Sequence, residues 1–246
     1  MQLNSLIEVD FKKDTHQYFR NGNEYVSQSK FVGIFEPTFD QSIVHACAKK
    51  EGITSSQMQA RWDKKRNDAA DHGNSIHGPL EDAELGKCYP MKYMQLVDEI
   101  RTLTQPCKLV IPEKILYLDE YKIAGTADRV QVRCVQKGKQ VVDIFDYKTN
   151  VSKGVTLYSS TFKNDKWNHY PESRFLGPIS HYEYSLYHKD CLQLSLYMYM
   201  CETNYDVIPG RMGILYINSE LEVRNIPVPY LKYEIIEMLK FYSQLK

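Results

Sequence analysis

Three stretches rich in aliphatic and aromatic residues occupy the middle of the chain and predict neighbouring strands. They cover about residues 107 to 118, 121 to 135 and 139 to 148. The polar, glycine-containing segment Gln136-Lys137-Gly138-Lys139 separates the last two and is typical of a hairpin turn. Similar but shorter patterns predict later strands near 211 to 218 and 221 to 227.

The segments on either side of these strands predict a hairpin and several helices. Asn21-Gly22-Asn23 lies between two short stretches with aromatic residues, 17 to 20 and 24 to 26, and indicates a hairpin. Residues 28 to 104 have mainly helical patterns, with breaks expected near Pro37, Gly52, Pro79 and Pro90. A closing helix is expected over 229 to 245, with an apolar stripe formed by Leu231, Ile235, Ile236, Leu239 and Tyr242.

Together these elements predict an α/β fold with a mixed central sheet flanked by helices and a largely helical N-terminal part. No internal repeat or change in composition marks a second domain, so one domain is expected over 1 to 246. Residues 1 to 68 would hold the hairpin and the first helices. Residues 69 to 246 would hold the core, interrupted by an aromatic-rich insertion at 149 to 183.

Composition narrows the class of protein. The chain has no apolar stretch of roughly 18 residues, and its start lacks the basic and apolar segments of a signal peptide. We therefore expect a cytoplasmic protein without a membrane partner. The 31 basic and 31 acidic residues give a net charge of zero. A nucleic-acid partner would then depend on local basic clusters such as Lys49-Lys50 and Lys64-Lys65-Arg66.

Candidate chemistry lies at the end of the third predicted strand, in Asp146-Tyr147-Lys148. Alternate residues of a strand point to the same face, so Asp146 and Lys148 place a carboxylate and an ammonium side by side. The carboxylate can hold Mg²⁺ or Mn²⁺, and the lysine can orient or deprotonate an attacking water and offset charge on a phosphate. The pair therefore suits hydrolysis of a phosphodiester.

A second carboxylate, Asp128, lies on the preceding strand. A three-residue loop centred on Lys137 would set Asp128 directly opposite Asp146. A two-residue Lys137-Gly138 turn would instead set Asp128 opposite Tyr147 and on the other face of the sheet. A metal shared by the two carboxylates therefore requires the first register or a bulge.

Three further groups of residues extend this pattern. Gly73, His77 and Glu81 are spaced four apart and would share one face of a helix, although Pro79 would bend or restart it. Glu113 precedes the apolar run at 115 to 118. Downstream, an amphipathic helix at 190 to 199 carries Gln193 and Tyr197 four apart, where packing in the core is the ordinary role of such residues.

In this order the residues resemble the RecB-like exonuclease branch of the PD-(D/E)XK nuclease superfamily, from about residue 69 to about 200. The branch has Gly-x-x-x-His-x-x-x-Glu, a glutamate, Gly-x-x-Asp, Asp-x-Lys and Gln-x-x-x-Tyr. The matching residues are Gly73, His77, Glu81, Glu113, Gly125, Asp128, Asp146, Lys148, Gln193 and Tyr197. The proline of the superfamily name is absent, since Ala127 precedes Asp128.

The resemblance implies a restriction-endonuclease-like core and a role for each residue. His77, Asp128, Asp146 and the backbone carbonyl of Tyr147 would bind Mg²⁺ or Mn²⁺. Lys148 would be the catalytic lysine, and Glu113 an auxiliary catalytic acid acting through water or a second ion. The residues that would support the site or touch DNA are Glu81, Gln193 and Tyr197, although Glu81 fits equally a solvated surface position.

The activity implied is that of a metal-dependent DNA exonuclease in replication, recombination or repair. A stand-alone chain of this length resembles phage versions, which would act in the bacterial host cytoplasm. Its partners would be single-stranded DNA or a duplex end, and a phage or host recombination or replication protein. A restriction-type or structure-specific endonuclease shares the same core, and a catalytically silent DNA-binding module is the alternative that is not an enzyme.

Two other features bear on cofactor and substrate. Several RecB-like nucleases hold an iron-sulfur cluster with one cysteine before the core and three grouped after it. The six cysteines here lack that grouping, so reduced thiols and no iron-sulfur cluster are expected. Residues 149 to 183 carry many aromatic side chains, among them Trp167 and Tyr170. They could clamp a single strand by stacking, or instead pack on the core.

Overall fold

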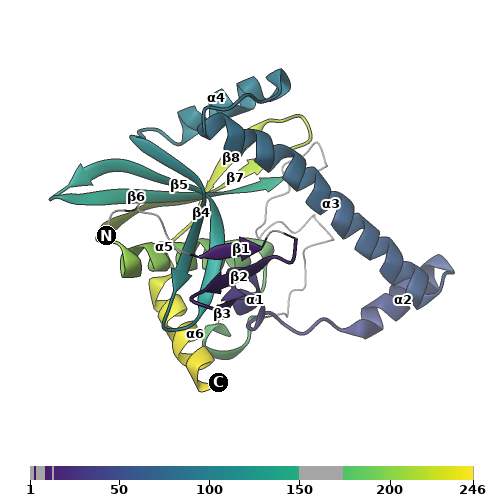
Figure 1. Cartoon of the computed structure of the whole chain (residues 1–246). Helices are drawn as coiled ribbons and strands as arrows, with labels where there is room; N and C mark the ends of the chain where they lie inside the picture. Colours follow the sequence, from purple (N-terminus) through teal and green to yellow (C-terminus); the bar gives the residue numbers. More distant parts are fainter. Residues whose placement is uncertain (1–2, 4–8, 13, 150–173, 246) are drawn as a thin grey trace.

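The computed structural model describes residues 3, 9–12, 14–149 and 174–245, and in this part of the chain eight strands form one mixed sheet (Figure 1). The strands are β1 (Asp10–Lys12), β2 (Gln17–Arg20), β3 (Asn23–Ser27), β4 (Leu109–Leu118), β5 (Ile123–Gln136), β6 (Lys139–Thr149), β7 (Val207–Ile217) and β8 (Val223–Pro227). Two pairs, β3 with β5 and β6 with β7, are parallel, and the other neighbours are antiparallel. The predicted α/β class with a mixed sheet flanked by helices is confirmed.

The described residues contain six α-helices. They are α1 (Gln28–Gly33), α2 (Gln41–Glu51), α3 (Ser55–Glu84), α4 (Met94–Leu103), α5 (Leu186–Asn204) and α6 (Lys232–Gln244). Helices α1, α5 and α6 bury one face of the sheet, in a core that includes Ile144. The last turns of α3 together with α4 bury the other face, where the next residue, Phe145, points. Alternation along β6 therefore supplies both cores.

Helix α3 is longer than predicted, because it continues through Pro79. A proline inside a helix leaves the carbonyl four residues earlier without its usual amide donor. Here the hydroxyl of Tyr93 donates to that carbonyl, of Ser75, at 2.9 Å. The predicted break near Pro79 is therefore wrong, whereas breaks occur near Pro37, Gly52 and Pro90 as expected. The N-terminal end of α3 and the adjoining α2 extend to one side of the sheet (Figure 1).

The register of β5 and β6 follows the second of the two predicted routes, a bulge. The turn is the two-residue Lys137-Gly138 form and not the three-residue loop, since Gln136 faces Lys139. A bulge between Val132 and Cys134 then shifts the pairing by one residue. Beyond the bulge Arg129 faces Phe145, the last pair of the two strands, and extending this register by one residue would set Asp128 opposite Asp146. The predicted alignment therefore arises from the bulge.

The sheet divides at the start of β5. Strand β4 follows one edge of β5 from Ile123 to Val132. On the other edge, β3 pairs with Ile123 and Ala124, and β6 pairs from Arg129 onward. Among the described residues no strand pairs with that edge over 125 to 128. This interval, called the fork below, contains Gly125 and Asp128.

The remaining expectations differ only in detail. Strand β1 was not predicted, and the closing helix begins at Lys232, with Met238 buried and Ile236 half-buried in its stripe. All six cysteines are free thiols. No helix in the described part of the chain combines the length and the apolar character needed to cross a membrane.

Candidate active site

A cavity of about 530 Å³ opens at the fork and gathers most of the residues that the sequence singled out. They are His77, Glu81, Glu113, Gly125, Asp128, Asp146, Lys148, Gln193 and Tyr197. They come from α3, β4, β5, β6 and α5, so segments far apart in the chain meet at one place. Trp167 and Tyr170 lie outside the described residues. Of the other aromatics in the insertion, Phe175 is buried in the core and the hydroxyl of Tyr182 donates to Glu234.

Asp128 is at the centre of the site. The backbone N–H of Tyr147 donates to its Oδ2 at 2.7 Å, and Nδ1 of His77 lies 3.8 Å from the same oxygen. One ligand atom from each of His77, Glu113 and Asp128 lies within 4.8 Å of the others. Burial, followed by the negative charge of Asp146, raises the pKa of Asp128 to about 6. The site therefore holds more acidic groups than its own basic side chains can neutralise.

Glu113 reaches the cavity through an unusual backbone conformation. Its neighbours Pro112 and Lys114 pair with Arg129 and Ala127, so Glu113 lies across from Asp128. The φ angle of Glu113 is 47°, in the left-handed region, which costs a non-glycine residue roughly 1 kcal/mol or more. Strain of this kind persists where the surrounding structure imposes it, and it commonly marks functional positions. Here it lies directly beside the aspartate.

Lys148 is held between two carboxylates. Its Nζ lies 2.7 Å from Oδ2 of Asp146 and 3.5 Å from Oδ1 of Asp190. Burial by itself lowers the pKa of Lys148, but the charges of Asp146 and Asp190 outweigh burial and hold that pKa above its ordinary value. The side chain is therefore an ammonium ion at neutral pH.

Asp190 was missed by the sequence reasoning. It stands on α5 three residues before Gln193 and seven before Tyr197, a spacing that places all three on one helix face. Its side chain is only 8% exposed, and its Oδ2 accepts no hydrogen bond from the described part of the protein. The helical spacing was the available signal, because an acid on an otherwise apolar helix face needs a buried cation as partner.

The ionisation of Asp190 provides a test of this arrangement in the absence of metal. Burial raises its pKa to about 6, above the value of an unfolded chain, so its contribution to stability is lost as pH rises through about 6. Asn in its place does not ionise. We expect the free energy of unfolding of Asp190→Asn to rise relative to that of the wild type from pH 5 to pH 8, because the wild type loses this stability between about pH 4 and pH 6.

Urea denaturation in EDTA at the two pH values measures this difference. The exposed Asp98, replaced by Asn, is the matched control and should show no such change with pH. A difference between wild type and Asp190→Asn that stays constant from pH 5 to pH 8 would contradict the expectation.

Gly125 and Tyr197 form the frame around the fork. A Cβ atom at Gly125 would lie 2.7 Å from Cβ of Gln28 and 2.9 Å from Cε1 of Tyr197, so glycine allows α1 and α5 to approach β5. The hydroxyl of Tyr197 donates at 2.7 Å to the carbonyl of Thr126, on the edge that lacks a strand partner. Tyr197 thus replaces a ladder hydrogen bond, which is a structural role.

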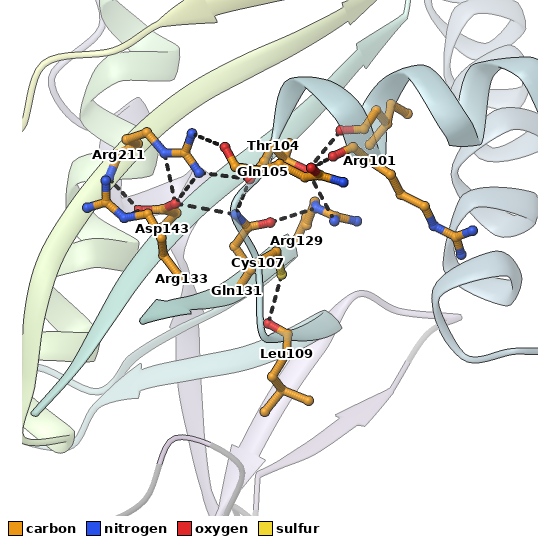
Figure 2. A network of polar contacts seen from close by, with 11 residues as sticks. Arg101, Thr104, Gln105, Cys107, Leu109, Arg129, Gln131, Arg133, Asp143 and Arg211 are labelled. Atoms are coloured by element: carbon orange, nitrogen blue, oxygen red, sulfur yellow. Dashed lines mark hydrogen bonds and ion pairs between the residues drawn. The ribbon is translucent and has the colours of Figure 1, made fainter. Parts of the chain in front are cut away.

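A network of polar contacts joins β5, β6 and β7 next to the two irregularities in their pairing (Figure 2). Asp143 on β6 is fully buried, and Figure 2 shows Arg133 and Arg211 on either side of it. Arg133 belongs to the bulge of β5, and a second shift in pairing, between β6 and β7, occurs next to Asp143. Asp143 accepts from the backbone N–H of Arg211 at 2.7 Å and pairs with its guanidinium at 2.7 Å. Both irregularities therefore converge on one carboxylate, three residues before Asp146.

The comparisons with known proteins give no family. No family model matches the chain, and no curated protein matches it. The protein SSO0001 aligns with a TM-score of 0.32 and 14% identity, over 90% of this chain and 76% of its own. A candidate exonuclease from Eubacterium rectale aligns with a TM-score of 0.33 and 11% identity, over 90% and 79%. At TM-scores this low neither structure indicates the function of this protein.

Proposed function

We propose that this protein is a metal-dependent nuclease that hydrolyses phosphodiester bonds of DNA, acting as an exonuclease. The observation that supports it is the cavity in which ligand atoms of His77, Glu113 and Asp128 lie within 4.8 Å of one another and which Asp146 and its ion-pair partner Lys148 also line. The order of these residues in the chain, which resembles the RecB-like pattern, supports the same activity. It also favours a role in replication, recombination or repair.

The donor set fits Mg²⁺ or Mn²⁺. Among the described residues the cavity is lined by four carboxyl groups and one lysine, and such a surplus of negative charge would repel a phosphate unless a cation were bound. His77, Asp128, Asp146 and the carbonyl of Tyr147 would hold the ion, with Glu113 within reach. When bound, the ion supplies Lewis acidity toward the phosphoryl oxygen and makes water more acidic.

Side chains of the protein would stabilise the charge that develops during hydrolysis. Lys148, an ammonium ion between Asp146 and Asp190, would donate to a phosphate oxygen or to the attacking water and offset the charge that grows in the transition state. Its raised pKa favours this electrostatic role over removal of a proton. Asp190 would keep the lysine in place once Asp146 is engaged by the ion.

The size of the cavity favours an exonuclease over an endonuclease that grips a duplex. About 530 Å³ is within the range of pockets that enclose a single small ligand, which suits one nucleotide. Entry of one nucleotide is simplest at a free end or in a single strand.

The test of this function is digestion of end-labelled linear and covalently closed DNA, each single and double stranded, with Mg²⁺, Mn²⁺ or EDTA. We expect loss of linear DNA from its ends with either metal and none in EDTA. Cutting of closed circles would favour the endonuclease instead. Binding without cutting of any DNA would leave the silent DNA-binding module as the better reading.

Metal binding is tested separately by calorimetry with Mn²⁺. Asp128→Asn should weaken the affinity for Mn²⁺ by about 10- to 100-fold or more, because it replaces a charged ligand by a neutral amide while keeping an oxygen that can accept from Tyr147 N–H. Asp98→Asn, on the exposed face of α4, is the control. Equal affinity in Asp128→Asn and wild type would remove Asp128 from the metal site.

A further inference from the structure

One wall of the cavity is aromatic and comes from the N-terminal strands. Phe11 on β1 and Tyr18 on β2 are cross-strand partners, and their rings stack with centroids 4.7 Å apart. The ring of His16 meets them edge-on, 5.2 Å from Phe11 and 5.9 Å from Tyr18. All three line the same cavity as Asp128 and Lys148. We call these three residues the aromatic wall.

The aromatic wall is fixed to the catalytic strands. Tyr18 is buried, and its hydroxyl forms a hydrogen bond of 3.0 Å with Oγ1 of Thr126 at the fork. Phe11 is half-buried and His16 is exposed, at a left-handed position with φ of 50°. Ring surface is therefore presented to a cavity that is otherwise acidic. The proposed hydrolysis makes no use of it.

A hydrogen-bond donor lies in the same cavity. Gln28, the first residue of α1, is only 5% exposed and lines the cavity. Its Nε2 has no hydrogen-bond acceptor in the described part of the protein. A buried amide donor left unsatisfied costs about 1 to 3 kcal/mol, so an acceptor on a bound ligand would be favoured there.

We propose that the aromatic wall and Gln28 bind an unpaired nucleotide of the substrate. Its base would stack on Phe11 with His16, whose ring is perpendicular to that of Phe11, against the edge of the base. Gln28 would donate to an acceptor of the same nucleotide, and its phosphodiester would lie toward Asp128 and Asp146. Aromatic faces bind every base, so the subsite selects single-stranded DNA or a frayed end rather than a sequence. This inference rests on the proposed nuclease function and names its substrate class.

The experiment measures binding apart from cutting. A short single strand carrying 2-aminopurine at one end is titrated with the full-length protein in Ca²⁺, and fluorescence reports stacking of that base. The matched duplex is titrated in parallel. Phe11→Leu keeps an apolar side chain and removes the ring, His16→Ala changes an exposed side chain, and Gln28→Met removes the donor. Phe39→Leu, at an exposed aromatic outside the cavity, is the control.

We expect the fluorescence to be quenched in wild type, and the Kd for the single strand to rise about 5- to 150-fold in Phe11→Leu, the equivalent of about 1 to 3 kcal/mol. His16→Ala and Gln28→Met should raise it in the same direction, and Phe39→Leu should not. The duplex should be bound more weakly by wild type and respond less to these changes.

The outcomes separate this inference from the nuclease proposal. If Phe11→Leu and His16→Ala both bind the single strand and quench the fluorescence as the wild type does, the aromatic subsite is overturned, even if DNA is cut. Quenching that depends on Phe11, with no cutting of any DNA in Mg²⁺ or Mn²⁺, would support the subsite and overturn the nuclease. Absence of binding to any DNA would overturn both. Because His16 is exposed, His16→Ala keeps the test valid if Phe11→Leu fails to fold.

Discussion

Replacing Lys148 by methionine should lower kcat for DNA cleavage about 100- to 1,000-fold, a larger effect than any change in Mn²⁺ affinity, and should destabilise the metal-free protein, because Asp146 and Asp190 lose the cation between them. Methionine keeps the length and most of the apolar stem but removes the ammonium that lies between Asp146 and Asp190. Lys148 is the one lysine among the described residues that line the cavity. Its loss therefore removes the protein's own positive charge from the place where negative charge grows.

The measurement is steady-state cleavage of labelled single-stranded DNA with Mg²⁺, with calorimetry and thermal unfolding on the same samples. Lys87→Met is the control, because Lys87 is exposed and pairs with a single acid, Asp82. A kcat within about threefold of wild type would show that Lys148 serves only as an ion-pair partner of the two aspartates. A fall in Mn²⁺ affinity as large as the fall in kcat would instead make the lysine part of the metal site.

The local parts of this site were accessible from sequence because each depends on short-range periodicity. Alternation along a strand put Asp146 and Lys148 on one face, and helical spacing put His77 and Glu81 on another. The strands themselves carry continuous apolar patterns and were found within a few residues of their ends. No distant part of the chain is needed for these inferences.

The features that the sequence did not predict depend on contacts between segments far apart in the chain. Helix α3 continues through Pro79 because a hydroxyl from Tyr93 reaches the carbonyl that the proline leaves unpaired. Asp190 reaches Lys148 because α5 packs against the end of β6, and the sequence of α5 alone does not indicate that contact. The stacking of Phe11 on Tyr18 likewise requires β1, a strand of only three residues. Short elements carry too little pattern to be predicted.

The alignment of Asp128 with Asp146 is the instructive case. From the hairpin alone the two-residue turn would put these carboxylates on opposite faces. The bulge that corrects it carries Arg133, whose guanidinium lies 3.4 Å from Asp143, and Asp143 in turn binds Arg211 of β7. A residue 68 positions away in the sequence thus helps to set the register of the site.

Arg211→Met should destabilise the protein by about 3 kcal/mol, because removing one partner leaves the buried carboxylate of Asp143 undercompensated. Two bonds to the carbonyls of Thr104 and Gln105 are lost as well. Adding Asp143→Leu should recover part of this stability, since it removes the uncompensated charge, while the backbone N–H of Arg211 and the side chain of Gln131 lose their acceptor. Urea denaturation of the two variants, with the exposed Arg224→Met as control, measures the difference.

The double variant also shows whether the network does more than stabilise the fold. If Asp143 fixes the two irregularities in pairing, the apolar pair restores part of the stability without restoring the register, and Mn²⁺ affinity should stay about 10-fold or more below wild type. A double variant that is stable and binds Mn²⁺ like the wild type would mean that the bulge forms without the carboxylate. The alignment of Asp128 with Asp146 would then be set within the β5–β6 hairpin itself, by the steric preferences of the residues around Arg133.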